Sequence, residues 1–182
     1  MSTVLIISGS PSSTARPGVV ATLVATALTA AGHSADLLAV RDLPTVALLA
    51  EDRAEPAISA ALSAVESADG LVVVSPVYRA AYSGLVKSLL DLLPTGALVG
   101  KAVLPLATGG SQGHLVALDF VLRPLLFAMG ATKVLPGHFV PDRMIEEPGT
   151  GTGAVLAPAR KALEDALVPF QDALRKASAL TA

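Results

Sequence analysis

A hydroxyl-rich segment with one arginine follows the first apolar run of the chain. It offers the side chains of Ser10, Ser12, Ser13, Thr14 and Arg16. Hydroxyls donate hydrogen bonds, a guanidinium adds a charged one, and the start of a following helix favours an anion through its free N–H groups. These residues predict a phosphate-binding loop. The alternative is an ordinary strand-to-helix turn with solvated hydroxyls.

The same segment lacks the signatures of two common nucleotide sites. It has neither the lysine of a P-loop at the required spacing nor the G-x-G-x-x-G pattern of a dinucleotide loop. Hydrolysis of a nucleoside triphosphate is therefore not expected. A second glycine-rich run at 149–153 follows Glu146-Glu147-Pro148 and no apolar strand, so we interpret it as a flexible loop.

A second candidate segment follows the third apolar run. Pro76 restricts the turn, and Tyr78 places an aromatic ring beside Val77, where a planar ligand can lie. Both tyrosines of the chain, Tyr78 and Tyr82, fall within 76–83. The alternative is that the two rings only cover the edge of a sheet.

A third candidate segment, residues 108–113, follows the fourth apolar run and precedes a helix. Glycine allows the backbone to approach a ligand closely. Successive N–H groups of Thr108, Gly109, Gly110 and Ser111 can therefore contact carbonyl oxygens such as those of a flavin pyrimidine ring. The segment predicts a second side of the same ligand site.

The third segment also permits a rival interpretation. Residues 109–113 match G-x-S-x-G, the pattern of a nucleophile elbow, so Ser111 is a candidate serine-hydrolase nucleophile. Its partners would be Asp119 or Asp142, and His138. Asp119 lies on the helix that Ser111 itself precedes and would have to fold back, and no second oxyanion loop is evident. The hydrolase therefore remains the weaker alternative.

The three segments are placed by alternating strand and helix patterns. Buried strands are predicted over 3–8, 34–40, 70–75, 101–107 and 132–139. Helices are predicted from about Pro17, over 56–68, around 85–93, over 114–129 with a kink at Pro124, and along the final 30 residues or so. Such alternation favours one parallel sheet with helices on both faces in a single domain over 1–182. Ligands of such sheets bind beyond the carboxyl ends of the strands, where the strand order reverses.

Composition excludes several other classes of site. The chain is 52% hydrophobic and 15% charged, with a net charge of −2, and no basic patch for nucleic acid is visible. It has no cysteine, and its three histidines are scattered, so no metal site is expected. No apolar run approaches the roughly 20 residues of a membrane span, and no leader is apparent, so a cytoplasmic location is expected.

Two stretches identify a family. SPVYRAAYSGLVKSLLDLL at 75–93 and GKAVLPLATGG at 100–110 closely resemble NADPH-dependent FMN reductases of two-component alkanesulfonate monooxygenase systems. The resemblance runs from Ile6 to about Gly137.

The resemblance implies a flavodoxin-like fold, a three-layer α/β sandwich with a five-stranded parallel sheet in the order 2-1-3-4-5. It implies that NADPH, or NADH, reduces FMN, and that an FMNH2-dependent monooxygenase receives the product. It places FMN contacts on the three segments above, and it implies a homo-oligomer, a dimer or tetramer, built through the helices after strands three and four. The cofactor-binding residues expected are Ser10, Ser12, Ser13, Thr14, Arg16, Pro76, Val77, Tyr78, Thr108, Gly109, Gly110 and Ser111.

The chain departs from the family pattern at two places. Pro17-Gly18 follows the loop arginine where relatives often carry serines. Phe120 stands where alkanesulfonate-type members have a tyrosine in a π-bulge near the flavin, so the ring is kept and the hydroxyl is lost. The alternatives left open are a quinone, azo-dye or metal reductase that retains FMN, and a flavin-binding module without catalysis.

Overall fold

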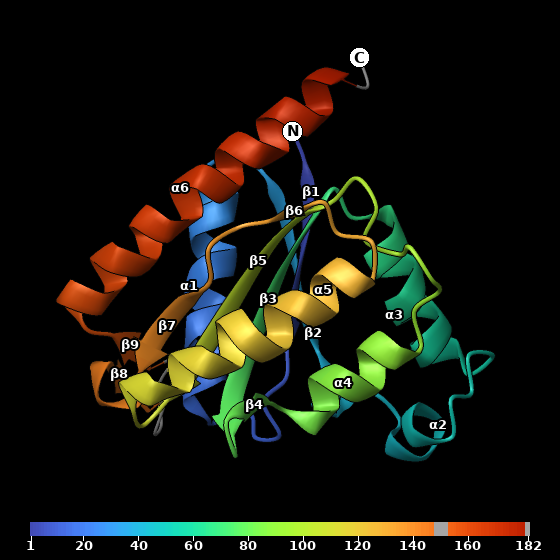
Figure 1. Cartoon of the computed structure of the whole chain (residues 1–182), viewed down its shortest axis with the longest axis horizontal. Helices are drawn as coiled ribbons and strands as arrows, with labels where there is room; N and C mark the ends of the chain where they lie inside the picture. The colour runs from blue at the N-terminus through green and yellow to red at the C-terminus, as the bar shows by residue number, and fades with distance from the viewer. Residues whose placement is uncertain (148–152, 181–182) are drawn as a thin grey trace.

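The structure is a computed structural model that describes residues 1–147 and 153–180. A sheet of parallel strands runs through it in the order β2, β1, β3, β5, with two short strands, β6 and β7, both beside β5 (Figure 1). These strands are β1 (Thr3–Ser8), β2 (Ser34–Ala39), β3 (Gly70–Tyr78), β5 (Ala102–Gly109), β6 (Lys133–Val134) and β7 (His138–Pro141).

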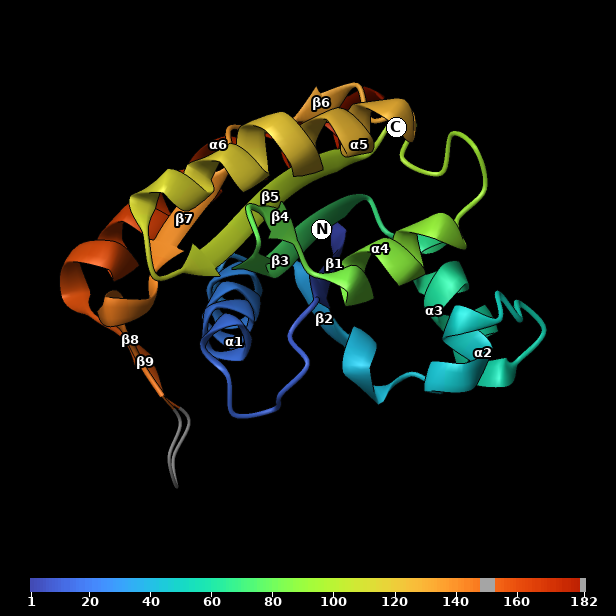
Figure 2. The same ribbon diagram turned by 60° about the horizontal axis from the view of Figure 1, so that its bottom comes forward.

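Two helix layers cover the sheet (Figures 1 and 2). On one face, α1 (Arg16–Ala30) and α6 (Ala157–Leu180) form one apolar core with the sheet. The opposite face carries a second core with α3 (Pro56–Ser67), α4 (Gly84–Asp91), and the π-helical segment η3 (Ala117–Leu122) that continues into α5 (Arg123–Ala128).

The central strands form because their apolar runs are buried on both faces. Every residue of β5, and every residue of β3 before Tyr78, is buried. Continuous apolar strands of this kind are typical of parallel sheets covered by helices. The predicted α/β class with a flavodoxin-like parallel sheet is confirmed. The predicted count of five strands is not, because β4 is added beside β3 and the fifth predicted strand is divided into β6 and β7.

The prediction of one continuous fifth strand over 132–139 is wrong in detail. The strand is broken into β6 and β7 around Pro136-Gly137. Proline has no N–H to donate to a neighbouring strand, so the pairing with β5 stops there and resumes at His138. β7 ends at Pro141, which pairs with Gly109 at the end of β5, so Asp142 lies at the carboxyl edge of the sheet.

Three segments outside the predicted helices and strands contain short elements. The stretch after β2 holds η1 (Val40–Asp42) and α2 (Thr45–Leu49). The predicted loop after the third strand is a hairpin, because β3 extends to Tyr78 and pairs with antiparallel β4 (Ala81–Tyr82). The segment after β7 contains η4 (Asp142–Met144), β8 (Ile145–Glu146) and β9 (Ala154–Val155), and the glycine-rich run at 149–153 lies, apart from Gly153, outside the described residues.

The predicted helix over 114–129 is irregular along its first half. It opens with η2 (Gln112–His114), a 3₁₀ turn, and passes into the π-helical η3 before α5 begins. Pro124 lies at one of the first two positions of α5, where a missing N–H costs least. The irregularity thus falls before Pro124, over the turn that carries Phe120. Within the described residues, no helix combines the length and apolar character needed to cross a membrane.

Candidate functional site

A cavity of about 190 Å³ lies where three predicted segments meet at the carboxyl ends of the strands. It brings together Arg16, Pro76, Val77, Tyr78, Thr108, Gly109 and Gly110 from the predicted set. Ala15, Pro17, Asp142 and Glu147 complete its lining. Ser10, Ser12, Ser13, Thr14 and Ser111 are not part of this lining.

The first segment is organised by its own hydroxyls. Ser10 is buried, and its Oγ donates to the carbonyl of Ser12 over 2.9 Å. The Thr14 N–H donates to Ser12 Oγ over 3.2 Å, while Ser13 is exposed. Ser10 therefore shapes the loop in this structure, and the hydroxyls of Ser12, Ser13 and Thr14 lie at the surface.

Arg16 opens α1 beside this loop and is already engaged. Its Nη2 lies 2.9 Å from Glu147 Oε1, and its Nε donates to the carbonyl of Ile145 over 3.4 Å. Ala15, the N-cap of α1, has no side-chain hydrogen bond to the helix. The positive charge and the first N–H groups of α1 thus point to an anion at this helix start.

The second segment is a hairpin with a tight tip. Arg79 and Ala80 have φ values of 51° and 61°, the left-handed conformation that two-residue hairpin turns require. These values are unfavourable for residues with a Cβ. The turn leaves Tyr78 52% exposed at the cavity, so its ring is accessible to a planar ligand.

Buried hydrogen bonds join the first and second segments. Ser83 Oγ donates to the Gly9 carbonyl over 2.7 Å, and the Ser83 N–H donates to Ser75 Oγ over 2.8 Å. Ser75 Oγ in turn donates to the Pro76 carbonyl over 2.8 Å. The cavity wall contributed by Pro76 is therefore fixed relative to the loop after β1.

The third segment presents backbone to the cavity. Thr108 and Gly109 end β5, and Thr108 is buried. A Cβ on Gly109 would lie 2.5 Å from His114 Nδ1, so this position requires glycine. A Cβ on Gly110 would meet nothing within 4 Å. Open space thus lies beside the Gly110 backbone.

The serine-hydrolase triad does not assemble. Ser111 is exposed, and its Oγ accepts a hydrogen bond from the Gly113 N–H over 3.3 Å. Within the described part of the chain, no hydrogen bond links this hydroxyl to His138, Asp119 or Asp142. Burial lowers the pKa of His138, but without a nucleophile beside it this does not create a catalytic base.

Phe120 lies in the π-helical segment, which packs beside the β4 strand of the hairpin. Its ring is 76% exposed. Leu115, Val116 and Phe127 are further exposed apolar side chains of the same helical region. We call the exposed surface of these four side chains the apolar face, although the exposed carboxylate of Asp119 lies in the same helical segment.

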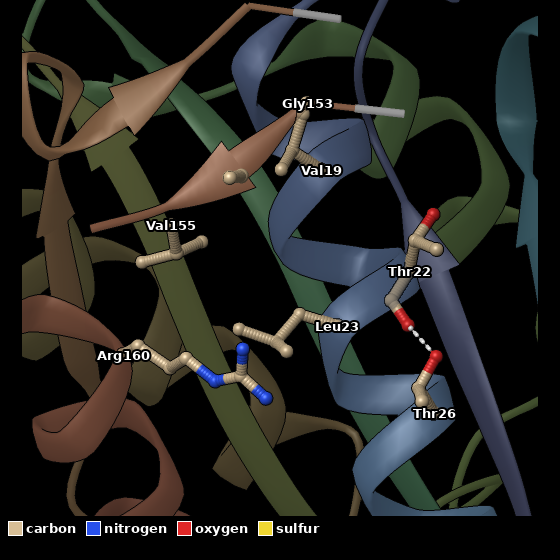
Figure 3. Close-up of a pocket in the computed structure, with 8 residues that line it drawn as sticks. Val19, Thr22, Leu23, Thr26, Gly153, Val155 and Arg160 are labelled. Carbon is tan, nitrogen blue, oxygen red and sulfur yellow. Dashed lines mark hydrogen bonds between the residues drawn. The ribbon is translucent and has the colours of Figure 1, made fainter. Parts of the chain in front are cut away.

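A second cavity, of about 270 Å³, lies between α1, β9 and α6 and contains none of the predicted residues (Figure 3). Two of its polar side chains, Thr26 and Arg160, have partners within their own helices. Thr26 Oγ1 donates to the Thr22 carbonyl over 2.9 Å, and Arg160 Nε lies 2.9 Å from Glu164 Oε1. Residues 1–147 and 153–180 hold no cluster of three potential metal-ligating side chains.

Comparison with known proteins decides the family. A family model described as NADPH-dependent FMN reductase matches residues 2–143. The chain belongs to this family. An FMN reductase (NADPH) of Pseudomonas putida is 39% identical over 174 residues, which cover 95% of this chain and 88% of that protein. An NADH-dependent FMN reductase of Pseudomonas fluorescens, SfnF, is 45% identical over 93 residues, 51% of this chain and 49% of that protein.

A solved structure extends the similarity to three dimensions. The apo form of the NADH:FMN oxidoreductase EMOB superposes with a TM-score of 0.83 at 37% identity, over 94% of this chain and 89% of that one. The FMN-reductase family and its fold, both expected from the sequence, are thus confirmed.

Sequence reasoning did not find Glu147 in this FMN reductase family member, and it considered Asp142 only as a triad partner of Ser111. Asp142 and Glu147 line the cavity from the segment after β7. The contacts of Arg16 with this segment are tertiary, since 129 positions separate it from Ile145. The only sequence signal was a pair of acidic residues after a predicted strand, and nothing in its spacing pointed to Arg16.

Proposed function

We propose that the cavity at the strand ends binds FMN, and that a reduced nicotinamide cofactor reduces the flavin there. The observation that carries this proposal is the meeting of Arg16, Tyr78 and the open Gly110 backbone in one cavity. The sequence predicted an NAD(P)H-dependent FMN reductase, and the family and the relatives confirm this class of enzyme. Which residues bind the flavin stays a proposal.

The residues present fit the chemistry of FMN. A phosphate monoester carries nearly two negative charges near pH 7 and needs charged donors. Arg16 supplies five N–H donors in a planar fork, and the surface hydroxyls of Ser12, Ser13 and Thr14 supply more. At the other end, the exposed Tyr78 ring and the space beside Gly110 suit a flat, conjugated ring system.

Bound FMN supplies the chemistry of the reaction, because its ring accepts hydride from the nicotinamide. The protein holds and orients the two reactants. Backbone N–H groups of Gly109, Gly110 and Ser111 would face the pyrimidine end of the ring and stabilise negative charge there. Hydride transfer between the two cofactors needs no side-chain acid or base.

The proposal includes the fate of the product and the assembly. Reduced FMN passes to an FMNH2-dependent monooxygenase, and NADPH or NADH is the donor, since relatives named for each are similar to this chain. The exposed apolar face around Phe120 packs against a second copy in a homo-oligomer, a dimer or tetramer, in the cytoplasm. One flavin-binding domain spans residues 1–182.

Steady-state kinetics test the function. NADPH and NADH oxidation is measured with and without FMN, FAD or riboflavin, and FMN-dependent turnover is expected. A yellow purified protein that turns over a quinone without added FMN would support the flavin-retaining reductase. Flavin binding without nicotinamide oxidation would support a non-catalytic module.

The phosphate site has a separate test. Arg16→Ala is expected to weaken FMN binding by about 1–3 kcal/mol, the contribution of a charged hydrogen bond, with riboflavin binding unchanged. Calorimetry with both ligands measures the difference. Equal FMN affinity in the variant and the wild type removes Arg16 from the site.

A further inference from the structure

The guanidinium proposed to bind the flavin phosphate already has a carboxylate partner. Arg16 Nη2 lies 2.9 Å from Glu147 Oε1, and Nε lies 3.4 Å from the carbonyl oxygen of Ile145. The Arg16 and Glu147 side chains are 37% and 60% exposed, and both residues line the cavity. A carboxylate therefore lies where a ligand anion would meet Arg16.

A phosphate and a carboxylate compete for the same donors. Both accept paired hydrogen bonds from the planar fork of an arginine. If Glu147 stays in place, two anions lie side by side; if it leaves, its contact with Arg16 is lost. In either case the carboxylate lowers the affinity for a phosphate-bearing ligand.

The other charged groups of the cavity do not compensate for Glu147. Asp142, from η4, is the second acidic residue in the lining and adds to the negative charge. Arg16 is the only arginine or lysine among the lining residues in the described part of the chain. The charges of Arg16, Glu147 and Asp142 together set the potential felt by a phosphate, and of the two carboxylates only Glu147 forms an ion pair with Arg16 among the described residues.

We infer that Glu147 is a specificity-determining residue that weakens the binding of FMN by competing with its phosphate for Arg16. The inference rests on the proposed function, because it requires FMN to bind at this cavity. It predicts that Glu147 narrows the difference in affinity between FMN and riboflavin, which has no phosphate. Weaker phosphate binding favours flavin as a substrate that leaves after reduction over flavin as a resident group.

The test removes the negative charge of Glu147 and keeps the size and shape of its side chain. Glu147→Gln is compared with Glu146→Gln, which neutralises the neighbouring exposed carboxylate outside the cavity lining. Dissociation constants for FMN and riboflavin are measured by quenching of flavin fluorescence at low and high salt. Glu147→Gln is expected to tighten FMN binding about two- to fivefold, the range of a solvent-exposed ion pair, with riboflavin unchanged.

Two further measurements sharpen the expectation. High salt should reduce the effect of Glu147→Gln, since exposed charges are screened. In an Arg16→Ala background, Glu147→Gln should change FMN affinity much less, because the guanidinium for which the carboxylate and the phosphate compete is absent. In steady state, the variant should lower the KM for FMN.

The opposing results are distinct. If the Glu147→Gln variant binds FMN more weakly than the wild type, Glu147 positions Arg16 for the phosphate. If its affinities for FMN and riboflavin change equally, Glu147 has a general structural role. Either result, or no difference from Glu146→Gln, overturns the inference while FMN binding itself stands. If the wild-type protein binds no FMN, the proposed function and the inference fail together.

Discussion

The Ser83 hydroxyl donates a 2.7 Å hydrogen bond to the carbonyl oxygen of Gly9. Ser83 is also the N-cap of α4, where its Oγ accepts from the Val86 N–H over 3.3 Å. One buried hydroxyl therefore ties the loop after β1 to the first turn of α4. The two walls of the proposed flavin site depend on this contact for their relative position.

Removal of the Ser83 hydroxyl should destabilise the protein and its site together. Ser83→Ala loses a helix cap and leaves the buried Gly9 carbonyl without this donor, so a loss of about 1–3 kcal/mol is expected. Urea unfolding of the flavin-free protein measures it. Ser88→Ala, whose hydroxyl donates to the Gly84 carbonyl within the same helix, is the control. Equal losses in the two variants would show that the contact with Gly9 contributes nothing.

Gly9 itself allows no side chain. An added Cβ would lie 2.3 Å from Val86 Cγ2 and 2.6 Å from Ser83 Oγ, and Val86 is fully buried. Gly9→Ala is expected to destabilise the protein by about 1–3 kcal/mol, because the core of α4 must shift. Gly84→Ala, where a Cβ meets nothing within 4 Å, should leave thermal stability unchanged or raise it. Similar melting temperatures for the two variants would contradict this packing argument.

The exposed ring of Phe120 gives the proposed oligomer a direct test. Phe120→Glu places a charge in the apolar face, so a smaller assembly is expected in light scattering coupled to size-exclusion chromatography. Val46→Glu is the matched control, because Val46 is a similarly exposed apolar residue (83%) on α2, outside the helical segment that carries Phe120. An unchanged mass for Phe120→Glu, across a range of protein concentrations, would place the interface elsewhere.

The sequence alone predicted those parts of the fold that depend on local patterns. The continuous apolar runs of β1, β3 and β5 are buried on both faces, so each strand could be predicted from its own residues. The break between β6 and β7 also had a local signal, the dipeptide Pro136-Gly137. Residues typical of strands lie on both sides of this dipeptide, so one continuous strand was predicted.

Other features depend on tertiary contacts and left little trace in the sequence. The hairpin after β3 turns at Arg79-Ala80, and neither residue is typical of a left-handed turn, so the segment was expected to be a loop. The pairing of Arg16 with Glu147 depends on where β7 ends in the sheet. By contrast, Gly109 and Tyr78 carried local signals, a glycine-rich turn and an aromatic ring after a strand, and the structure brings both to one cavity.

Stability should decline as the pH falls through the weakly acidic range. Burial lowers the pKa of both His33 and His138 below the usual 6.5, and the positive charges of Arg175 and the N-terminus add to the effect at His33. The unfolded chain therefore takes up protons first as the pH falls below 6.5. The free energy of unfolding therefore decreases as the pH falls from about 6.5 to the lower pKa values of the folded protein. Well above pH 6.5 both histidines are neutral in the folded and unfolded chain, and this contribution to stability is fully present.

Urea denaturation at pH 7.5, 6.5 and 5.5 measures this dependence. The wild type should lose stability between the first and last values, and the double variant His33→Gln/His138→Gln should lose less over the same range. The comparison uses the change with pH within each protein, since the substitutions alter the absolute stability as well. An identical change in both proteins would assign the dependence to other groups.

The sheet separates two apolar cores, and the proposed flavin site draws on both. Arg16 belongs to α1, which packs with α6 on one face, whereas Tyr78 and Ser83 belong to the hairpin and α4 on the other. A flavin that contacts both sides would link the opening of one layer to the opening of the other. Amide hydrogen exchange should therefore slow on binding even at Phe170 and Leu89, buried on opposite faces of the sheet.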